Sequence, residues 1–171
     1  MSKVYLAADF GGGSGRVIAG WLEDGKLVME EVHRFGNRQV RLGEHVYWDF
    51  PALFEDMKAG LKKAASKGYQ VESIGVDTWG VDFGLIDRDG QLIGNPVCYR
   101  DARTAGMTEK LFETLSPTEH YATTGIQVME INTLAQLLSI KGTAQLEAAE
   151  HLLFMPDLFS YFLTGKANNE Y

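Results

Sequence analysis

Residues 4–22 read VYLAADFGGGSGRVIAGWL, and this stretch decides the fold. Val4–Asp9 is a short, almost unbroken apolar run ending in an acid, which is typical of a strand buried within a sheet. The glycines at 11–13 predict a turn, because glycine adopts backbone conformations that other residues avoid. The β-branched and aromatic residues at 16–22 predict a second strand rather than a helix. The chain therefore opens as two strands joined by a glycine turn.

The residues that follow extend this sheet and then cover it. Asp24-Gly25 is a hairpin signal, and it predicts a third strand from Lys26 to about Phe35. Asp49 is placed to cap a helix over 51–67, with Gly68 at its end. The apolar positions of that helix predict a buried face made of Leu53, Phe54, Met57, Leu61 and Ala65.

Val71–Asp77 is a second apolar run that ends in an acid, and it predicts another buried strand. The order of three strands, a helix and a strand opens the ribonuclease H-like fold shared by actin-like ATPases. We therefore expect an α/β protein of this class. By itself a fold says little about activity.

Beyond this point we expect one hairpin and then mainly helices. Val81–Ile86 and Gln91–Ile93 predict a hairpin around Asp89-Gly90. Capping and stop signals predict three helices, which begin after Ser116 (with Glu119 completing a capping box), after Asn132 and at Pro156. We expect residues 1–104 to hold the ribonuclease H-like strands and helix of an incomplete amino-terminal domain, and 105–171 to form a mostly helical insertion.

Composition excludes several classes of protein. The 171 residues are 45% apolar, enough for one core, and no apolar run approaches the ~20 residues of a membrane span. The net charge is −7 with no basic cluster, which disfavours nucleic acid as a partner. A single cysteine, Cys98, and an amino terminus unlike a secretory signal predict a cytoplasmic protein. The four histidines show no metal-binding spacing.

The glycine turn has the composition of a phosphate site. Between Asp9 and Arg16 lie a carboxylate, exposed backbone amides, the Ser14 hydroxyl and a guanidinium. Successive amides can form an anion-binding concavity, Arg16 can add charge-assisted hydrogen bonds, and Asp9 can hold Mg²⁺ through water. A Walker A loop requires Gly-Lys-Ser/Thr, and the dinucleotide fingerprint requires a third glycine opening a helix, so neither motif is present. The alternative is a plain hairpin turn.

A second cluster, at Asp77–Gly84, suggests a polyol site. Asp77 falls at the carboxyl end of a predicted strand, which is where open α/β sheets bind ligands. Its carboxylate can accept hydrogen bonds from hydroxyls, and the indole of Trp79, beside Gly80, can pack on the carbon face of a sugar. The alternative is that Asp77 caps a loop and Trp79 fills the core. The neighbours of Asp82 predict a solvated edge position for it.

Tyr99–Thr104 places three charges and an aromatic ring at the end of a strand. Tyr99 and the charged side chains can reach a sugar from there. Alternatively, Asp101 forms a salt bridge with Arg100 or Arg103 that holds the loop.

Taken together, these segments resemble the rhamnulokinase branch of the FGGY carbohydrate kinases. The resemblance rests on Asp9–Arg16, on the Asp-Thr-Trp-Gly-Val-Asp-Phe sequence at 77–83 and on the Tyr-Arg-Asp-Ala-Arg-Thr sequence at 99–104. It continues through Gly125–Gln127, Asn132–Leu134 and Met155–Lys166 as far as Tyr171. The 77–83 sequence is the specific signal, since the glycine turn is shared across the wider family.

The resemblance implies transfer of the ATP γ-phosphate to the 1-hydroxyl of L-rhamnulose, with Mg²⁺. It places the ATP phosphates on Gly12, Gly13, Ser14, Gly15 and Arg16, and the metal near Asp9. It places the ketose at Gly80, with Asp77, Trp79 and Tyr99 close to it. One residue departs from the pattern, because Gly13 stands where rhamnulokinases commonly have serine.

The resemblance also puts the aspartate base and the adenine-binding domain beyond Tyr171. We therefore expect this chain alone to be inactive and to expose surfaces that favour self-association. Three alternatives remain: another FGGY kinase acting on xylulose, fuculose or glycerol, a non-catalytic actin-like nucleotide-binding protein, and a purely structural domain.

Overall fold

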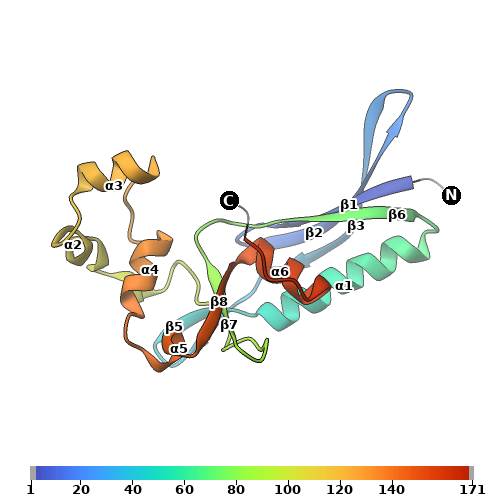
Figure 1. The fold of residues 1–171 in the computed structure, drawn as a ribbon. Coiled ribbons are helices and arrows are strands. Elements are labelled where there is room, and N and C mark those ends of the chain that lie inside the picture. Colours follow the sequence, from blue (N-terminus) through green and yellow to red (C-terminus); the bar gives the residue numbers. More distant parts are fainter. Residues whose placement is uncertain (1–2, 170–171) are drawn as a thin grey trace.

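A four-stranded sheet forms the centre of the computed structural model, which describes residues 3–169 (Figure 1). Strands β1 (Lys3–Phe10), β2 (Ser14–Glu23) and β3 (Lys26–Gly36) form the predicted antiparallel meander. Strand β6 (Gln70–Asp77) lies beside β1 and parallel to it, which gives the order β3-β2-β1-β6. The predicted strands form, but the prediction that Val71–Asp77 is a buried strand is wrong. No residue of β6 is buried, because within residues 3–169 this strand lies at the edge of the sheet.

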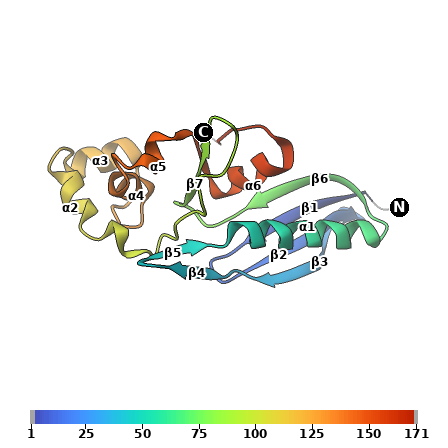
Figure 2. The ribbon, with the colours of Figure 1, turned by 90° about the horizontal axis from the view of Figure 1, so that it is seen from below.

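One face of this sheet is covered and the other is open. Side chains alternate along β1, so that Val4, Leu6, Ala8 and Phe10 are buried while Tyr5 on the opposite face is 60% exposed. The buried side chains face helix α1 (Phe50–Ser66), which runs along the sheet (Figure 2).

Helix α1 begins where the sequence predicts. The Asp49 side chain accepts a hydrogen bond from the Ala52 N–H at 3.3 Å and so caps the first turn. Its buried residues are Phe50, Leu53, Met57, Gly60 and Ala64. Ala65 was expected on this face, but it is exposed, and the buried stripe runs through Gly60 and Ala64 instead.

The second half of the chain returns to pack beside the sheet. Strand β7 (Phe83–Asp87) pairs antiparallel with β8 (Ala149–Phe154), which the sequence analysis did not predict. The predicted hairpin forms its turn, but 91–93 contributes only a bridge from Leu92 to Ile86, on the edge of β7 opposite to β8. A further hairpin of β4 (Gln39–Leu42) and β5 (His45–Trp48) was also missed.

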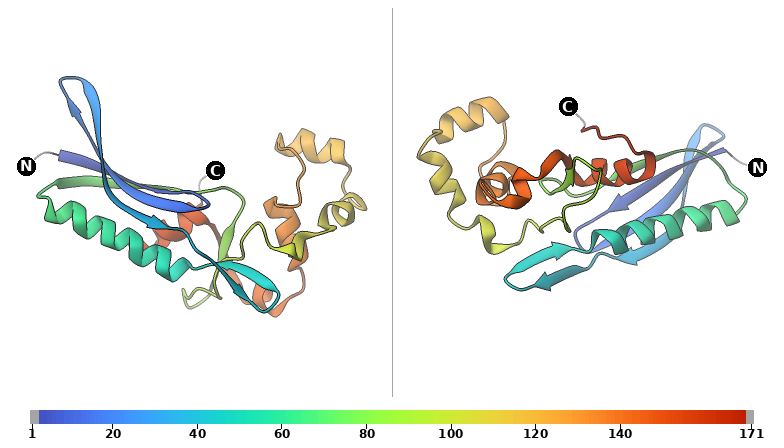
Figure 3. Two further views of the ribbon diagram at one scale, coloured as in Figure 1. Left: turned by 180° about the vertical axis from the view of Figure 1, so that it is seen from behind. Right: turned by 60° about the horizontal axis from the view of Figure 1, so that its bottom comes forward.

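The remaining helices lie mainly to one end of the sheet, where α2, α3 and α4 stand away from it (Figure 3). The elements are η1 (Ala102–Thr104), α2 (Met107–Phe112), α3 (Pro117–Thr124), α4 (Thr133–Ser139), α5 (Ala144–Glu147) and α6 (Met155–Thr164). The predicted starts of α3, α4 and α6 are confirmed. Ser116 Oγ accepts from the Glu119 N–H at 3.2 Å, whereas Asn132 makes no capping hydrogen bond and donates instead to the Gln127 carbonyl.

Helix α6 joins the two halves of the core. The Phe159 ring stacks on Phe10 of β1 with centroids 4.2 Å apart, and it lies 4.8 Å from the ring of Phe50 in α1. Both helices therefore pack on the same face of the sheet (Figure 2). No helix within residues 3–169 combines the length and apolarity that crossing a bilayer requires.

Gly60 sets how closely α1 approaches β2. A Cβ atom at this position would lie 2.8 Å from Val17 Cβ and closer still to Val17 Cγ2. We predict that Gly60→Ala lowers the free energy of unfolding by about 1–3 kcal/mol, because overpacking outweighs the better helix propensity of alanine. Urea unfolding followed by circular dichroism measures this change. Gly36→Ala is the control, since nothing lies within 4 Å of its Cβ position, and an equal loss in both variants would contradict the packing argument.

Candidate functional site

The glycine turn between β1 and β2 is held mainly through its carbonyl groups, and two of its amides are left free. The Gly11 N–H donates to the Ser14 carbonyl at 2.8 Å. Asn37 donates from Nδ2 to the Gly11 carbonyl at 2.8 Å and from its backbone N–H to the Gly13 carbonyl at 3.2 Å. Within residues 3–169 no group accepts from the amides of Gly12 and Gly13, which are therefore available to an anion. The sequence analysis missed Asn37, since nothing local marks a residue that acts on a distant turn.

The other predicted phosphate residues differ in their surroundings. Gly13 and Ser14 are exposed, and nothing lies within 4 Å of a Cβ position on Gly13. Gly15 is buried, and its Cβ position would overlap Cε2 and Cζ of the Phe35 ring. Gly15 therefore permits the close packing of β2 against Phe35, in addition to any role beside phosphate.

Two carboxylates meet where β1 and β6 end. The parallel register pairs Asp9 with Asp77, so their Cα atoms lie about 4.8 Å apart across the ladder. On its other side Asp9 pairs with Arg16, whose Nε donates to Asp9 Oδ2 at 2.8 Å. The Asp77 carboxylate is exposed and takes part in no hydrogen bond with the described residues. Carboxylate oxygens beside a phosphate turn are the donors that Mg²⁺ prefers, so Asp9 fits such an ion.

The loop from Thr78 to Val81 separates two cavities. One, of about 280 Å³, is lined by Trp79 and Gly80 together with Phe154 and Pro156. The other, of about 240 Å³, lies between the same loop, Tyr99 and Ile131. Each is near the lower end of the range for small-molecule sites, which begins at roughly 300 Å³. The Trp79 ring packs against the core and also lines both cavities.

Asp82 lies in the interior, which corrects the prediction of a solvated edge position. It is 1% exposed, and its Oδ2 accepts from Trp48 Nε1 at 2.6 Å, from Trp79 Nε1 at 2.9 Å and from the Tyr99 N–H at 3.1 Å. Its Oδ1 accepts from Gln136 Nε2 at 2.8 Å. Burial raises the pKa of Asp82 above its ordinary value, although these hydrogen bonds act in the opposite direction.

The Tyr99-Arg100 segment meets the glycine turn. A Cβ placed on Gly12 would lie 3.4 Å from the Tyr99 hydroxyl and 3.9 Å from Arg100 Nη2. The Arg100 guanidinium lies over the Tyr99 ring, 5.1 Å from its centroid. The fold thus brings the predicted phosphate turn next to the predicted sugar residues.

Asp101 does not form the predicted ion pair with an arginine. Its Oδ1 lies 3.0 Å from His45 Nδ1 and accepts from the Arg103 N–H, while Oδ2 accepts from the Val46 N–H at 2.7 Å. Burial acts to raise the pKa of Asp101, but these hydrogen bonds outweigh it and hold that pKa below its ordinary value. Asp101 is therefore structural, and it ties β5 to the start of η1.

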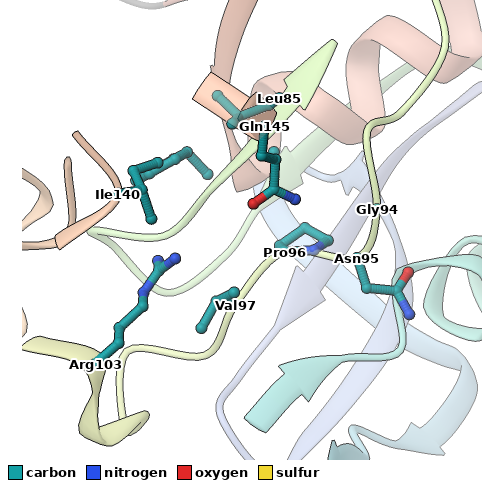
Figure 4. A pocket seen from close by; sticks show the side chains of 10 residues that line it. Leu85, Gly94, Asn95, Pro96, Val97, Arg103, Ile140 and Gln145 are labelled. Carbon is teal, nitrogen blue, oxygen red and sulfur yellow. The ribbon is translucent and has the colours of Figure 1, made fainter. Parts of the chain in front are cut away.

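A third cavity lies away from these groups. It is bordered by Arg103, Ile140 and Gln145 together with the 94–97 segment (Figure 4). Its volume of about 20 Å³ holds roughly one water molecule, which excludes a sugar.

The comparison with known families agrees with this geometry. Residues 4–171 match the amino-terminal domain of the FGGY family of carbohydrate kinases. The chain belongs to this family. The FGGY resemblance predicted from the sequence is confirmed.

Named relatives of this FGGY domain include two rhamnulokinases. Those of Bacteroides thetaiotaomicron and Oceanobacillus iheyensis are 46% and 43% identical to it over 173 residues. Each alignment covers 100% of this chain but only 36% and 37% of the relative, so the chain spans just over a third of their length.

Solved structures confirm the predicted ribonuclease H-like, actin-like fold of this FGGY domain. The gluconate kinase of Lactobacillus acidophilus superimposes with a TM-score of 0.84 over 98% of this chain and 34% of the other. The sequence identity is 16%, so this likeness concerns the fold alone.

Gly15 and Gly13 lie in one turn but should respond differently to the same substitution. We predict that Gly15→Ala lowers the melting temperature by several degrees, because its Cβ would overlap the Phe35 ring. Gly13→Ala should leave the melting temperature within about a degree, since the space around it is open. Differential scanning calorimetry measures both variants. Equal melting temperatures would show that Phe35 moves aside freely and that Gly15 has no packing role.

Proposed function

We propose that this chain forms the phosphate-binding and sugar-binding wall of a kinase that transfers the ATP γ-phosphate to the 1-hydroxyl of L-rhamnulose. The observation that carries the proposal is the meeting of Gly12 with Tyr99 and Arg100. A phosphoryl donor on the turn and an acceptor in the Trp79 cavities would then be neighbours, as phosphoryl transfer requires.

On the donor side, the chain supplies amides and positive charge. The free amides of Gly12 and Gly13, the Ser14 hydroxyl and the exposed part of Arg16 can bind phosphate oxygens, with Gly15 closing the turn beneath them. Asp9 would hold Mg²⁺ through water, and that ion would neutralise charge on the phosphates. Gly13 lacks the hydroxyl that a serine would add at this point.

On the acceptor side, the chain supplies a carboxylate and an aromatic face. The exposed Asp77 carboxylate can accept hydrogen bonds from sugar hydroxyls. Trp79 and Tyr99 offer ring faces to its carbon atoms, and Gly80 lets the sugar approach the backbone closely. The relatives named rhamnulokinase favour L-rhamnulose among ketoses. Such a metabolic kinase would work in the cytoplasm, on a free sugar and ATP, without nucleic acid or membrane.

The direct test uses the full-length enzyme of which this chain is the amino-terminal part. With ATP, Mg²⁺ and L-rhamnulose, we expect rhamnulose 1-phosphate, detected by mass spectrometry, at a higher kcat/KM than for xylulose, fuculose or glycerol. The 171-residue chain assayed alone should form no product, because it matches just over a third of its relatives and the base is expected elsewhere.

Each other outcome has a defined meaning. A higher kcat/KM for another sugar would reassign the substrate, and nucleotide binding without turnover of any sugar would favour a non-catalytic protein. An ordinary rate from the 171-residue chain would overturn the placement of the base. We also propose that this chain alone self-associates, since within residues 3–169 β6 is paired on one side only and one sheet face is open.

Two substitutions should separate the donor and acceptor sides in the full-length enzyme. Arg16→Ala should lower kcat about 30- to 1000-fold with little change in the KM for ketose, because one charged donor to phosphate is worth roughly 2–4 kcal/mol.

Asp77→Asn should raise the KM for ketose roughly 5- to 150-fold with little change in the KM for ATP, because a hydroxyl then faces an amide donor. Steady-state kinetics with each substrate varied checks both. If Asp77→Asn only lowers the melting temperature, Asp77 is structural.

A further inference from the structure

Asp82 is the most deeply buried carboxylate near the proposed sugar site, and it borders the cavity of about 280 Å³ although it is only 1% exposed. Three hydrogen-bond donors converge on its Oδ2, from the indoles of Trp48 and Trp79 and from the backbone of Tyr99. A buried carboxylate is costly unless such donors satisfy it, so its presence calls for a reason beyond packing.

The three hydrogen bonds to Asp82 link three aromatic residues that also pack against one another. The ring centroids of Trp48 and Trp79 lie 4.2 Å apart, and those of Trp48 and Tyr99 lie 6.1 Å apart. Trp48 is fully buried, whereas Trp79 and Tyr99 line the cavity of about 240 Å³. One oxygen atom therefore holds the Trp79 indole and the Tyr99 backbone, and the Trp48 ring packs against both aromatic rings.

The same carboxylate steadies a strained loop. Val81 has a φ of 70°, a left-handed conformation that β-branched residues rarely adopt. Its carbonyl accepts from Thr133 Oγ1 at 2.8 Å and from Gln136 Nε2 at 3.3 Å. Gln136 also donates to Asp82 Oδ1 and to the Ile131 carbonyl. Helix α4 and Asp82 thus hold the strained backbone that presents Gly80 to the cavities.

We propose that Asp82 is a positioning residue of the sugar site, which sets the orientation of Trp79 and Tyr99 and the backbone of Gly80 for ketose binding. This inference rests on the proposed function and extends it. Asparagine cannot replace the carboxylate. If its oxygen served the three donors at Oδ2, its NH₂ would face the Gln136 amide nitrogen. Gln136 cannot rotate without losing its hydrogen bonds to the carbonyls of Ile131 and Val81 and from Arg103 Nη2.

The test is Asp82→Asn in the full-length enzyme, with ketose and ATP varied separately. We expect the KM for ketose to rise at least tenfold, the KM for ATP to stay within twofold, and discrimination among ketoses to fall. The control is Asp87→Asn, the same change at the end of β7, where the carboxylate accepts from the Asp89 and Gln91 amides. This variant should keep both KM values. An Asp82→Asn enzyme with normal kinetics per folded molecule and only a lower melting temperature would overturn the proposal.

A milder variant covers the case in which Asp82→Asn does not fold. Trp48→Phe keeps an aromatic ring but removes one donor from Asp82, and Trp48 lines neither of the two cavities. We expect a two- to fivefold higher KM for ketose and an unchanged KM for ATP. Unchanged values for both would count against the positioning role.

A measurement without ligand separates this inference from the proposed function. Hydrogen–deuterium exchange at 79–82 and 99 should be faster in Asp82→Asn or Trp48→Phe, and unchanged in Asp87→Asn. If the wild-type enzyme phosphorylates no ketose, the proposed function fails, and this exchange pattern still decides whether Asp82 orders the loop. Unchanged exchange in both network variants would overturn that role as well.

Discussion

The parallel pairing of β1 with β6 is the constraint on which the rest of the site depends. It aligns Asp9 with Asp77 at the carboxyl ends of two adjacent strands, although two hairpins and a helix separate them in the sequence. The loop after each strand must then leave the sheet at the same edge. The glycine turn and the Trp79 loop are therefore neighbours, because they follow two strands that are hydrogen-bonded to each other in parallel.

Side chains from distant parts of the sequence fix the conformation of these two loops. Asn37 donates to the carbonyls of Gly11 and Gly13, while the amides of Gly12 and Gly13 have no acceptor among residues 3–169. The Trp79 loop is held in a similar way. Asp82, in the interior, accepts from the Trp79 indole, and Gln136 of α4 donates to Asp82. In both loops a polar side chain forms hydrogen bonds with backbone or indole groups on the side of the loop that faces the protein. The other side of the loop is left free for a ligand. Two adjacent loops with different exposed groups fit a site in which one loop binds phosphate and the other binds a polyol.

The helix α6 secures this arrangement to the core. Its Phe159 ring lies between β1 and α1, while β8, just before it, pairs with β7. The last described elements of the chain therefore stabilise the strand that carries Asp9 and the strand that follows Asp82. The apolar contacts of α6, near the end of the sequence, thus support the polar groups of the site near its beginning. The site therefore depends on the whole described chain.

The sequence by itself determined the local elements and the kinds of chemistry. The strand β1, the Asp24-Gly25 hairpin and the Asp49 cap depend on a few neighbouring residues, so they could be predicted from the sequence and are confirmed. The glycine turn and Asp77 were found as candidate ligand groups for the same reason. Only the tertiary structure decided which groups meet. The pairing of β7 with β8, the burial of Asp82 and the partner of Asp101 were missed or wrongly predicted, because each depends on residues far away in the sequence. Hydrophobic periodicity and capping are short-range signals, whereas the burial of a carboxylate depends on which donors the completed fold brings to it.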